Sequence, residues 1–196
     1  MTVQYTNRKS KTYYLHEGKT KTGKPKYHFS MKEEGKLVKK IPDGYEIYEH
    51  PTNAQVFLRK EQPRIITDIE RHLIDKYLKK INTSGRYIFD VKLKVITIFE
   101  SDQDIDELRE MISSIFAPGF KDEKSAIDFT VNSAISYLPV IRFTLDNKVK
   151  RTFIAERYCF LGSIDDWIYI GGPDSLNNLL KKYSKHLGKE SFFDFY

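Results

Sequence analysis

Residues 87–100 read YIFDVKLKVITIFE. Apolar and polar side chains alternate along this stretch, which predicts one long β-strand. One face of that strand would be apolar and consist of Phe89, Val91, Leu93, Val95 and Phe99. The other would be charged and consist of Asp90, Lys92, Lys94 and Glu100. Such alternation is typical of an antiparallel sheet that is packed on one face and open to water on the other.

Helical patterns flank this strand. Apolar residues spaced three or four apart predict four helices, over 64–81, 105–116, 123–137 and 174–187. Asp174 is the expected N-cap of the last helix, and the β-branched residues of the third leave a strand open as the alternative there. Further strands are expected near 140–145, 150–160 and 166–171. Because helices and strands do not alternate regularly, the prediction is an α+β fold with a one-sided antiparallel sheet packed by helices.

The first third of the chain has a different pattern. Four short strands are expected there, over Thr12–His16, Lys26–Ser30, Tyr45–Glu49 and Gln55–Arg59. They predict a small antiparallel β-meander that follows a loose polar arm over residues 1–10. A boundary at Pro63 would then divide the chain into a basic β-meander module, residues 1–61, and an α+β scaffold or assembly domain, residues 62–196.

The positive charge of the 196-residue chain is concentrated in this first third. Residues 1–64 carry 14 Lys and Arg against 7 Asp and Glu, whereas residues 65–196 carry 19 against 20. The densest run, KTKTGKPK at residues 19–26, lies between two expected strands and is flanked by aromatic rings. A basic run with neighbouring rings is typical of a surface that binds nucleic acid.

The leading prediction is therefore a non-enzymatic nucleic-acid-binding or accessory protein. The lysines would neutralise phosphates, and the rings would stack on bases if the nucleic acid is single-stranded. The candidate contacts are Lys11, Tyr13, Lys19, Lys21, Lys24, Lys26, Tyr27 and His28, with His16 beside them. Lysine outnumbers arginine by 11 to 3 in residues 1–64, which disfavours sequence-specific base reading. DNA and RNA stay open, and so does the alternative that these lysines only solvate and protect a hairpin.

A protein–protein adaptor or assembly subunit is the second hypothesis. The only tryptophan, Trp167, follows two acidic residues, and the chain closes on an aromatic tail. An aromatic anchor of this kind would bind a protein partner or a second copy of the chain. Its candidate residues are Trp167, Phe193, Phe195 and Tyr196. The competing interpretation is that these rings pack within the chain itself.

A divergent metal-dependent nuclease is the third hypothesis. Nucleases of the PD-(D/E)xK type place an acidic residue and a lysine two positions apart on a strand, where carboxylates hold Mg²⁺ and the lysine stabilises charge. Asp90, Lys92 and Glu100 have this spacing, and Glu70 could add a carboxylate. The open face of a strand carries charged residues in any case, so the spacing alone is weak support.

The remaining sequence features exclude several classes of site. The five histidines are scattered, and the single cysteine, Cys159, can form neither a thiolate zinc cluster nor an internal disulfide. No phosphate-binding glycine loop is present. No cofactor or metal is expected. No apolar run reaches the length of a membrane span, and the first residues lack the apolar segment of a secretory signal. The expectation is a cytoplasmic protein without a membrane partner.

Overall fold

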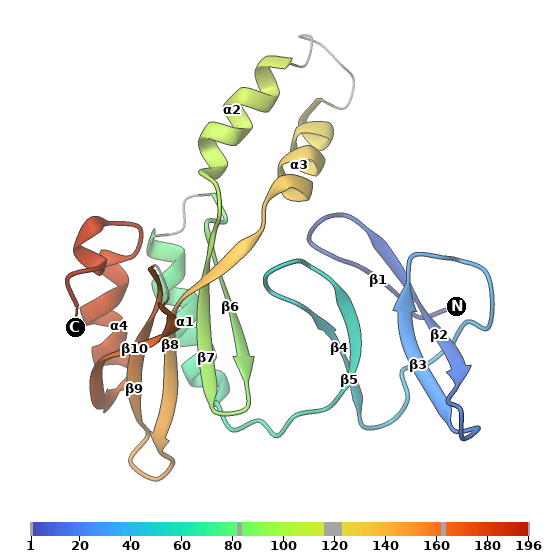
Figure 1. The fold of residues 1–196 in the computed structure, drawn as a ribbon, viewed down its shortest axis with the longest axis horizontal. Helices are drawn as coiled ribbons and strands as arrows, with labels where there is room; N and C mark the ends of the chain where they lie inside the picture. The colour runs from blue at the N-terminus through green and yellow to red at the C-terminus, as the bar shows by residue number, and fades with distance from the viewer. Residues whose placement is uncertain (1, 82–83, 116–122, 162–163, 196) are drawn as a thin grey trace. The chain divides into compact units, whose positions relative to one another are not determined.

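A five-stranded antiparallel sheet organises the second half of the chain (Figure 1). The computed structural model describes residues 2–81, 84–115, 123–161 and 164–195. The sheet has the order β10-β9-β8-β7-β6. Its strands are β6 (Tyr87–Lys92), β7 (Val95–Ser101), β8 (Tyr137–Asn147), β9 (Thr152–Leu161) and β10 (Ile164–Ser175). The predicted α+β class is confirmed.

Helices cover one face of this sheet. They are α1 (Asp68–Ile81), α4 (Leu176–Tyr183) and the 3₁₀ turns η1 (Ser184–His186) and η2 (Glu190–Phe192). Ile98, Ile141 and Phe153 of the sheet and Ile74 and Leu180 of the helices are fully or almost fully buried in one apolar core. This burial is the main stabilising term of the layer, because apolar area removed from water contributes about 25 cal/mol per Å².

The prediction of one long strand over residues 87–100 is wrong. The chain reverses at Leu93 and Lys94, and β6 pairs with β7 from Tyr87↔Glu100 to Lys92↔Val95. Leu93 takes a left-handed conformation with φ 54°, which is uncommon for a residue that is not glycine. The turn contains none of the glycine, asparagine, aspartate or proline residues that usually mark a reversal.

The start of α1 is also later than predicted. Thr67 Oγ1 accepts a hydrogen bond from the Glu70 amide at 3.3 Å, and Glu70 Oε2 accepts one from the Thr67 amide at 2.8 Å. This reciprocal pair is a capping box, and it begins the helix at Asp68 instead of residue 64. Glu70 also accepts a hydrogen bond from Arg151 Nε at 2.9 Å, which ties α1 to the β8–β9 turn.

The N-cap of α4 is likewise displaced by one residue. Ser175, and not Asp174, occupies the cap, and its Oγ accepts a hydrogen bond from the Asn178 amide at 3.3 Å. Asp174 still contributes, because its Oδ1 accepts from the Asn178 side-chain nitrogen at 3.0 Å. Both residues therefore satisfy donors near the first turn.

The chain forms two compact units. One combines residues 62–105 with 137–196 and contains the five-stranded sheet. The other combines residues 1–61 with 106–136. Its elements are β1 (Gln4–Thr6), β2 (Thr12–Lys19), β3 (Pro25–Ser30), β4 (Tyr45–Glu49), β5 (Val56–Lys60), α2 (Ile105–Ile115) and α3 (Glu123–Ala134). The functional division into a binding module and a scaffold stays a prediction.

The first unit corrects the predicted four-stranded meander. Strands β1, β2 and β3 form one antiparallel sheet, and β4 and β5 form a separate hairpin. The expected loose arm over residues 1–10 contains β1, which pairs with β2 from Gln4↔Tyr14 to Thr6↔Thr12. The segment following β3 returns to β2, where the Glu17 amide donates to the Lys36 carbonyl at 2.9 Å. This segment thus continues, beyond the short strand β1, the hydrogen bonding along that edge of β2.

Polar contacts join the sheet to the β4–β5 hairpin. Glu49 accepts a hydrogen bond from Tyr5 Oη at 3.0 Å and one from Arg8 Nη1 at 2.7 Å. Burial, followed by the hydrogen bond and charge of Glu49, raises the pKa of Tyr5. Asn7 Nδ2 donates to the carbonyl of the buried residue Ala54 at 2.7 Å. These contacts hold the N-terminal strand in place.

Glu70→Ala is expected to lower the free energy of unfolding by about 3 kcal/mol, because it removes the capping box and leaves Arg151 without its carboxylate. Urea denaturation measures the loss. Asp75→Ala is the control, since it removes only the exposed Asp75–Lys79 pair and should cost about 0.5 kcal/mol. Equal losses in the two variants would contradict the structural role of Glu70.

Candidate nucleic-acid interface

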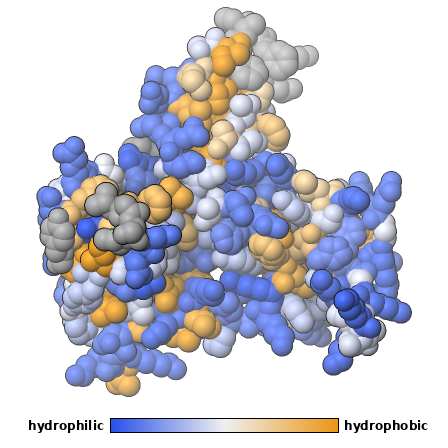
Figure 2. Space-filling view, viewed as in Figure 1, coloured by the Kyte–Doolittle hydropathy of each residue, from blue (hydrophilic) through white to orange (hydrophobic). Residues whose placement is uncertain are grey.

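The β2–β3 turn gathers the basic side chains that the sequence singles out. Strands β2 and β3 pair from Tyr14↔Ser30 to Lys19↔Pro25, so residues 20–24 form the tip of the hairpin. Lys19, Lys21, Lys24 and Lys26 are all exposed there. The turn lies among hydrophilic atoms (Figure 2). Four like charges thus fall within one short segment.

Thr20 fixes the conformation of this tip. Its backbone amide donates to the Lys24 carbonyl at 2.8 Å, and its carbonyl accepts from the Gly23 amide at 2.9 Å. Its hydroxyl donates to the same Lys24 carbonyl at 3.2 Å and accepts from the Lys24 amide at 3.1 Å. Gly23 takes φ 79°, a conformation that glycine adopts without steric cost. The lysines therefore extend from an ordered turn.

The charges of the tip are not neutralised internally. In the parts of the chain that the structure describes, no carboxylate forms an ion pair with Lys19, Lys21, Lys24 or Lys26. The nearest acidic residue along the strands, Glu17, pairs with Lys36 at 2.9 Å. The tip can therefore offer its full charge to a partner.

The aromatic candidates divide between the two faces of the sheet. Tyr27 is paired with Glu17 and therefore lies on the same face of the sheet as Tyr13. Its ring meets the Tyr45 ring edge-on, with the two centroids 6.4 Å apart. His28 is paired with His16 on the other face, and the two rings stack at 5.3 Å. Tyr13 and Tyr27 are half-buried, whereas His28 is exposed. Only His28 has an exposed ring next to the lysines.

Lys11 does not belong to this cluster. It precedes β2 at the end opposite to the turn, and its amide donates to Asn7 Oδ1 at 2.9 Å. A strand rises about 3.3 Å per residue, so the eight residues of β2 place Lys11 roughly 25 Å from the tip. One extended strand of nucleic acid would be needed to reach both.

The three acidic and basic residues of the nuclease hypothesis do not converge. Asp90 pairs with Thr97, whereas Glu100 pairs with Tyr87, which places Asp90 and Glu100 on opposite faces of the β6–β7 hairpin. Glu100 accepts a hydrogen bond from Arg86 Nε at 2.7 Å. Glu70 is occupied by Thr67 and Arg151. Across the described ranges, no group of three or more His, Cys, Asp or Glu side chains could hold a metal ion.

The aromatic residues of the adaptor hypothesis are mostly packed. Trp167 is half-buried. The guanidinium carbon of Arg142 lies 4.5 Å from the centroid of its ring, and the Tyr158 ring meets it edge-on with the ring centroids 5.2 Å apart. Phe195 contacts Tyr183 at 5.0 Å, in the core of the second unit. Phe193 is 60% exposed. Tyr196 lies outside the described residues.

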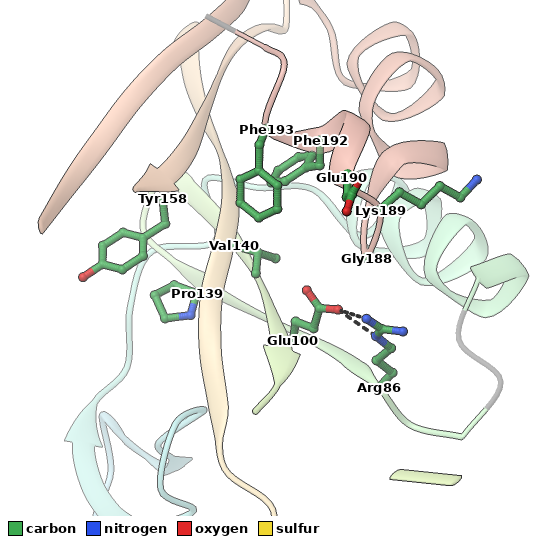
Figure 3. A pocket seen from close by; sticks show the side chains of 10 residues that line it. All are labelled: Arg86, Glu100, Pro139, Val140, Tyr158, Gly188, Lys189, Glu190, Phe192 and Phe193. Atoms are coloured by element: carbon green, nitrogen blue, oxygen red, sulfur yellow. Dashed lines mark hydrogen bonds and ion pairs between the residues drawn. The ribbon is translucent and has the colours of Figure 1, made fainter. Parts of the chain in front are cut away.

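A pocket that the sequence did not reveal lies in the second unit (Figure 3). Its volume is about 340 Å³. Apolar walls come from β8, β9 and the segment after α4, and an ion pair lies at one end. The lining residues are Arg86, Glu100, Pro139, Val140, Tyr158, Gly188, Lys189, Glu190, Phe192 and Phe193. No local motif could predict this pocket, because its residues come from five separate parts of the chain.

Comparison of the chain with models of protein families, with curated proteins and with solved structures gave no match. No helix among the described residues is both long and apolar enough to cross a membrane. Functional inference therefore depends on the geometry and charge of the sites themselves.

Gly23→Ala is expected to destabilise the turn by about 1 kcal/mol, because an L side chain strains the backbone at φ 79°, although the space around Gly23 is open. Chemical shifts of residues 19–26 and urea denaturation measure the effect. Gly18→Ala is the matched control within the same hairpin, since Gly18 has no positive φ and an added Cβ would lie 3.7 Å from the Lys26 carbonyl oxygen. A neutral Gly23→Ala would contradict an ordered turn.

Proposed function

We propose that this protein binds nucleic acid through the phosphate backbone, with the β2–β3 turn as the contact. The observation that carries the proposal is the group of four exposed lysines on an ordered turn, with no carboxylate partner among the residues that the structure describes. Each lysine that neutralises a phosphate releases condensed counterions, and this release supplies the affinity. The exposed ring of His28 lies close enough along β3 to stack on a base.

The proposed contact has little sequence preference. An ammonium group is a hydrated point charge, whereas the guanidinium of arginine is the usual bidentate reader of guanine. The turn contains lysines and no arginine. The proposal also keeps the cytoplasm as the expected compartment, because the single cysteine of the chain, Cys159, is buried and free.

Binding to labelled DNA or RNA is expected to weaken steeply with salt. Four neutralised phosphates give a slope of log affinity against log salt of about −3.6 on duplex DNA and about −2.8 on single strands. Lys19, Lys21, Lys24 and Lys26 changed together to Ser should remove most of this slope, because the variant loses the four charges at the turn. Fluorescence anisotropy across a salt titration measures both.

The control variant changes Lys148, Lys150, Lys181 and Lys185 to Ser. These four lysines are also exposed but lie in the second unit, so the net charge falls equally in the two variants. The control should keep the slope of the wild type. Binding that is absent in the wild type, or lost equally in both variants, would refute the turn as the contact.

A further inference from the structure

The pocket of the second unit contains an acceptor that the protein does not use. Glu100 Oε1 accepts from Arg86 Nε at 2.7 Å, from Arg86 Nη2 at 2.5 Å and from Tyr87 Oη at 3.1 Å. Among the described residues, none donates a hydrogen bond to the second oxygen, Oε2. Oε2 points towards Val140 and the phenyl rings (Figure 3). A carboxylate oxygen beside apolar walls favours a ligand with an N–H group.

The carboxylate is held rigidly in this position. Tyr87 is buried, and burial followed by the charge of Glu100 raises its pKa, so the phenol stays protonated and donates. Gly188 takes φ 72°, and a Cβ there would lie 2.7 Å from Tyr87 Oη and 2.8 Å from Arg86 Nη2. The chain can therefore close over the ion pair only with glycine at this position. Such a pre-organised acceptor loses little entropy on binding.

The charges around the pocket favour a neutral ligand. Arg86 and Lys189 balance Glu100 and Glu190, so neither a cation nor an anion is favoured by net charge. Coulomb energy thus favours neither class of ion, which leaves a neutral ligand as the best match to the lining.

The walls of the pocket favour a flat ring. Phe193 is 60% exposed and lies with its ring 5.9 Å from that of buried Phe192, at an interplanar angle of 72°. Pro139 and Val140 lie along β8, and Tyr158 lies on β9. One exposed aromatic face opposite aliphatic side chains accommodates a planar heterocycle, which gains stacking and apolar contact together.

We propose that this pocket binds a single nucleobase, guanine, stacked on Phe193 with its Watson–Crick edge towards Glu100. Guanine suits the unused oxygen best. Its ring N–H and its amino group are adjacent donors on one edge, so both can point at the same acceptor. The inference rests on the proposed nucleic-acid function. It adds a site that selects one base to the contact that binds the phosphate backbone. It uses residues of the second unit only, so it can fail independently of the lysine turn.

The test uses nucleosides, which carry no phosphate and cannot engage the lysines electrostatically. Guanosine, 1-methylguanosine, adenosine and uridine are titrated into the full chain, and binding is followed by the indole N–H resonance of Trp167. That indole is a suitable reporter because Trp167 is the only tryptophan and contacts pocket-lining Tyr158. Guanosine is expected to bind, with 1-methylguanosine, adenosine and uridine about tenfold weaker or more.

Two pocket variants and two matched controls locate the site. Phe193→Ala removes the stacking wall and should weaken guanosine binding about tenfold or more, whereas Phe160→Ala changes an even more exposed ring outside the pocket. Glu100→Gln turns an amide N–H₂ into the pocket and should weaken binding to a similar extent. Glu46→Gln is its control, because Glu46 Oε1 pairs with Arg59 as Glu100 Oε1 pairs with Arg86, and Glu46 belongs to the other unit and not to the one that holds the pocket and Trp167.

The outcomes separate the two proposals. Guanosine binding that is lost in both pocket variants and kept in both controls supports the guanine site, whether or not the lysine variant still binds polymer. Absence of saturable nucleoside binding by the wild type overturns it. Equal affinity for guanosine and 1-methylguanosine, a preference for adenosine or uridine, or full binding by Phe193→Ala overturns it as well, even where Glu100→Gln fails to fold.

Discussion

The reversal at Leu93 and Lys94 determines which side chains of the five-stranded sheet reach its core. Side chains alternate along a strand, and a two-residue turn pairs residue 92 with residue 95. The odd-numbered residues of β6 therefore share a face with the even-numbered residues of β7. Val91 joins Ile96 in the core, and Tyr87 joins Glu100. A shift of one residue in the register of β6 and β7 would move Glu100 to the open face and break its hydrogen bonds with Arg86 and Tyr87.

Arginine and lysine differ in where they lie and in how often they form ion pairs in this chain. Six of the nine ion pairs found in the described residues use arginine. The pairs formed by Arg86, Arg142 and Arg151 hold glutamates that are buried or half-buried. The planar guanidinium forms two hydrogen bonds with a carboxylate and is weakly hydrated, so it suits such positions. Ammonium groups are strongly hydrated and stay at the surface. The lysines of the turn are thus left available to a partner.

Local patterns predicted the elements whose signals are contained within a few residues. The periodicity of residues 105–116 and the position of Tyr45–Glu49 agree with α2 and β4, because short-range spacing alone decides them. The turn at Leu93 has no turn residue, so nothing local distinguished two strands from one. The capping box at Thr67 and Glu70 was readable from its spacing but was hidden by the more conspicuous Pro63. Ile69, one of the spaced apolar residues that predict the helix over 64–81, is 82% exposed because Glu70 and Ile74 face inwards instead.

The candidate sites differ in the same way. The lysine turn is contiguous in sequence, so composition located it, although the separation of Lys11 and the division of the rings between two faces required the strand register. The pocket joins Arg86 to Phe193 and depends on long-range pairing. The two proposed sites also differ in the physical contribution that each would make. Phosphate contacts position a nucleic acid and contribute salt-dependent affinity, whereas a base pocket discriminates with little dependence on salt. On this proposal, the lysine turn supplies affinity without sequence preference, and the carboxylate oxygen of the pocket supplies the selectivity.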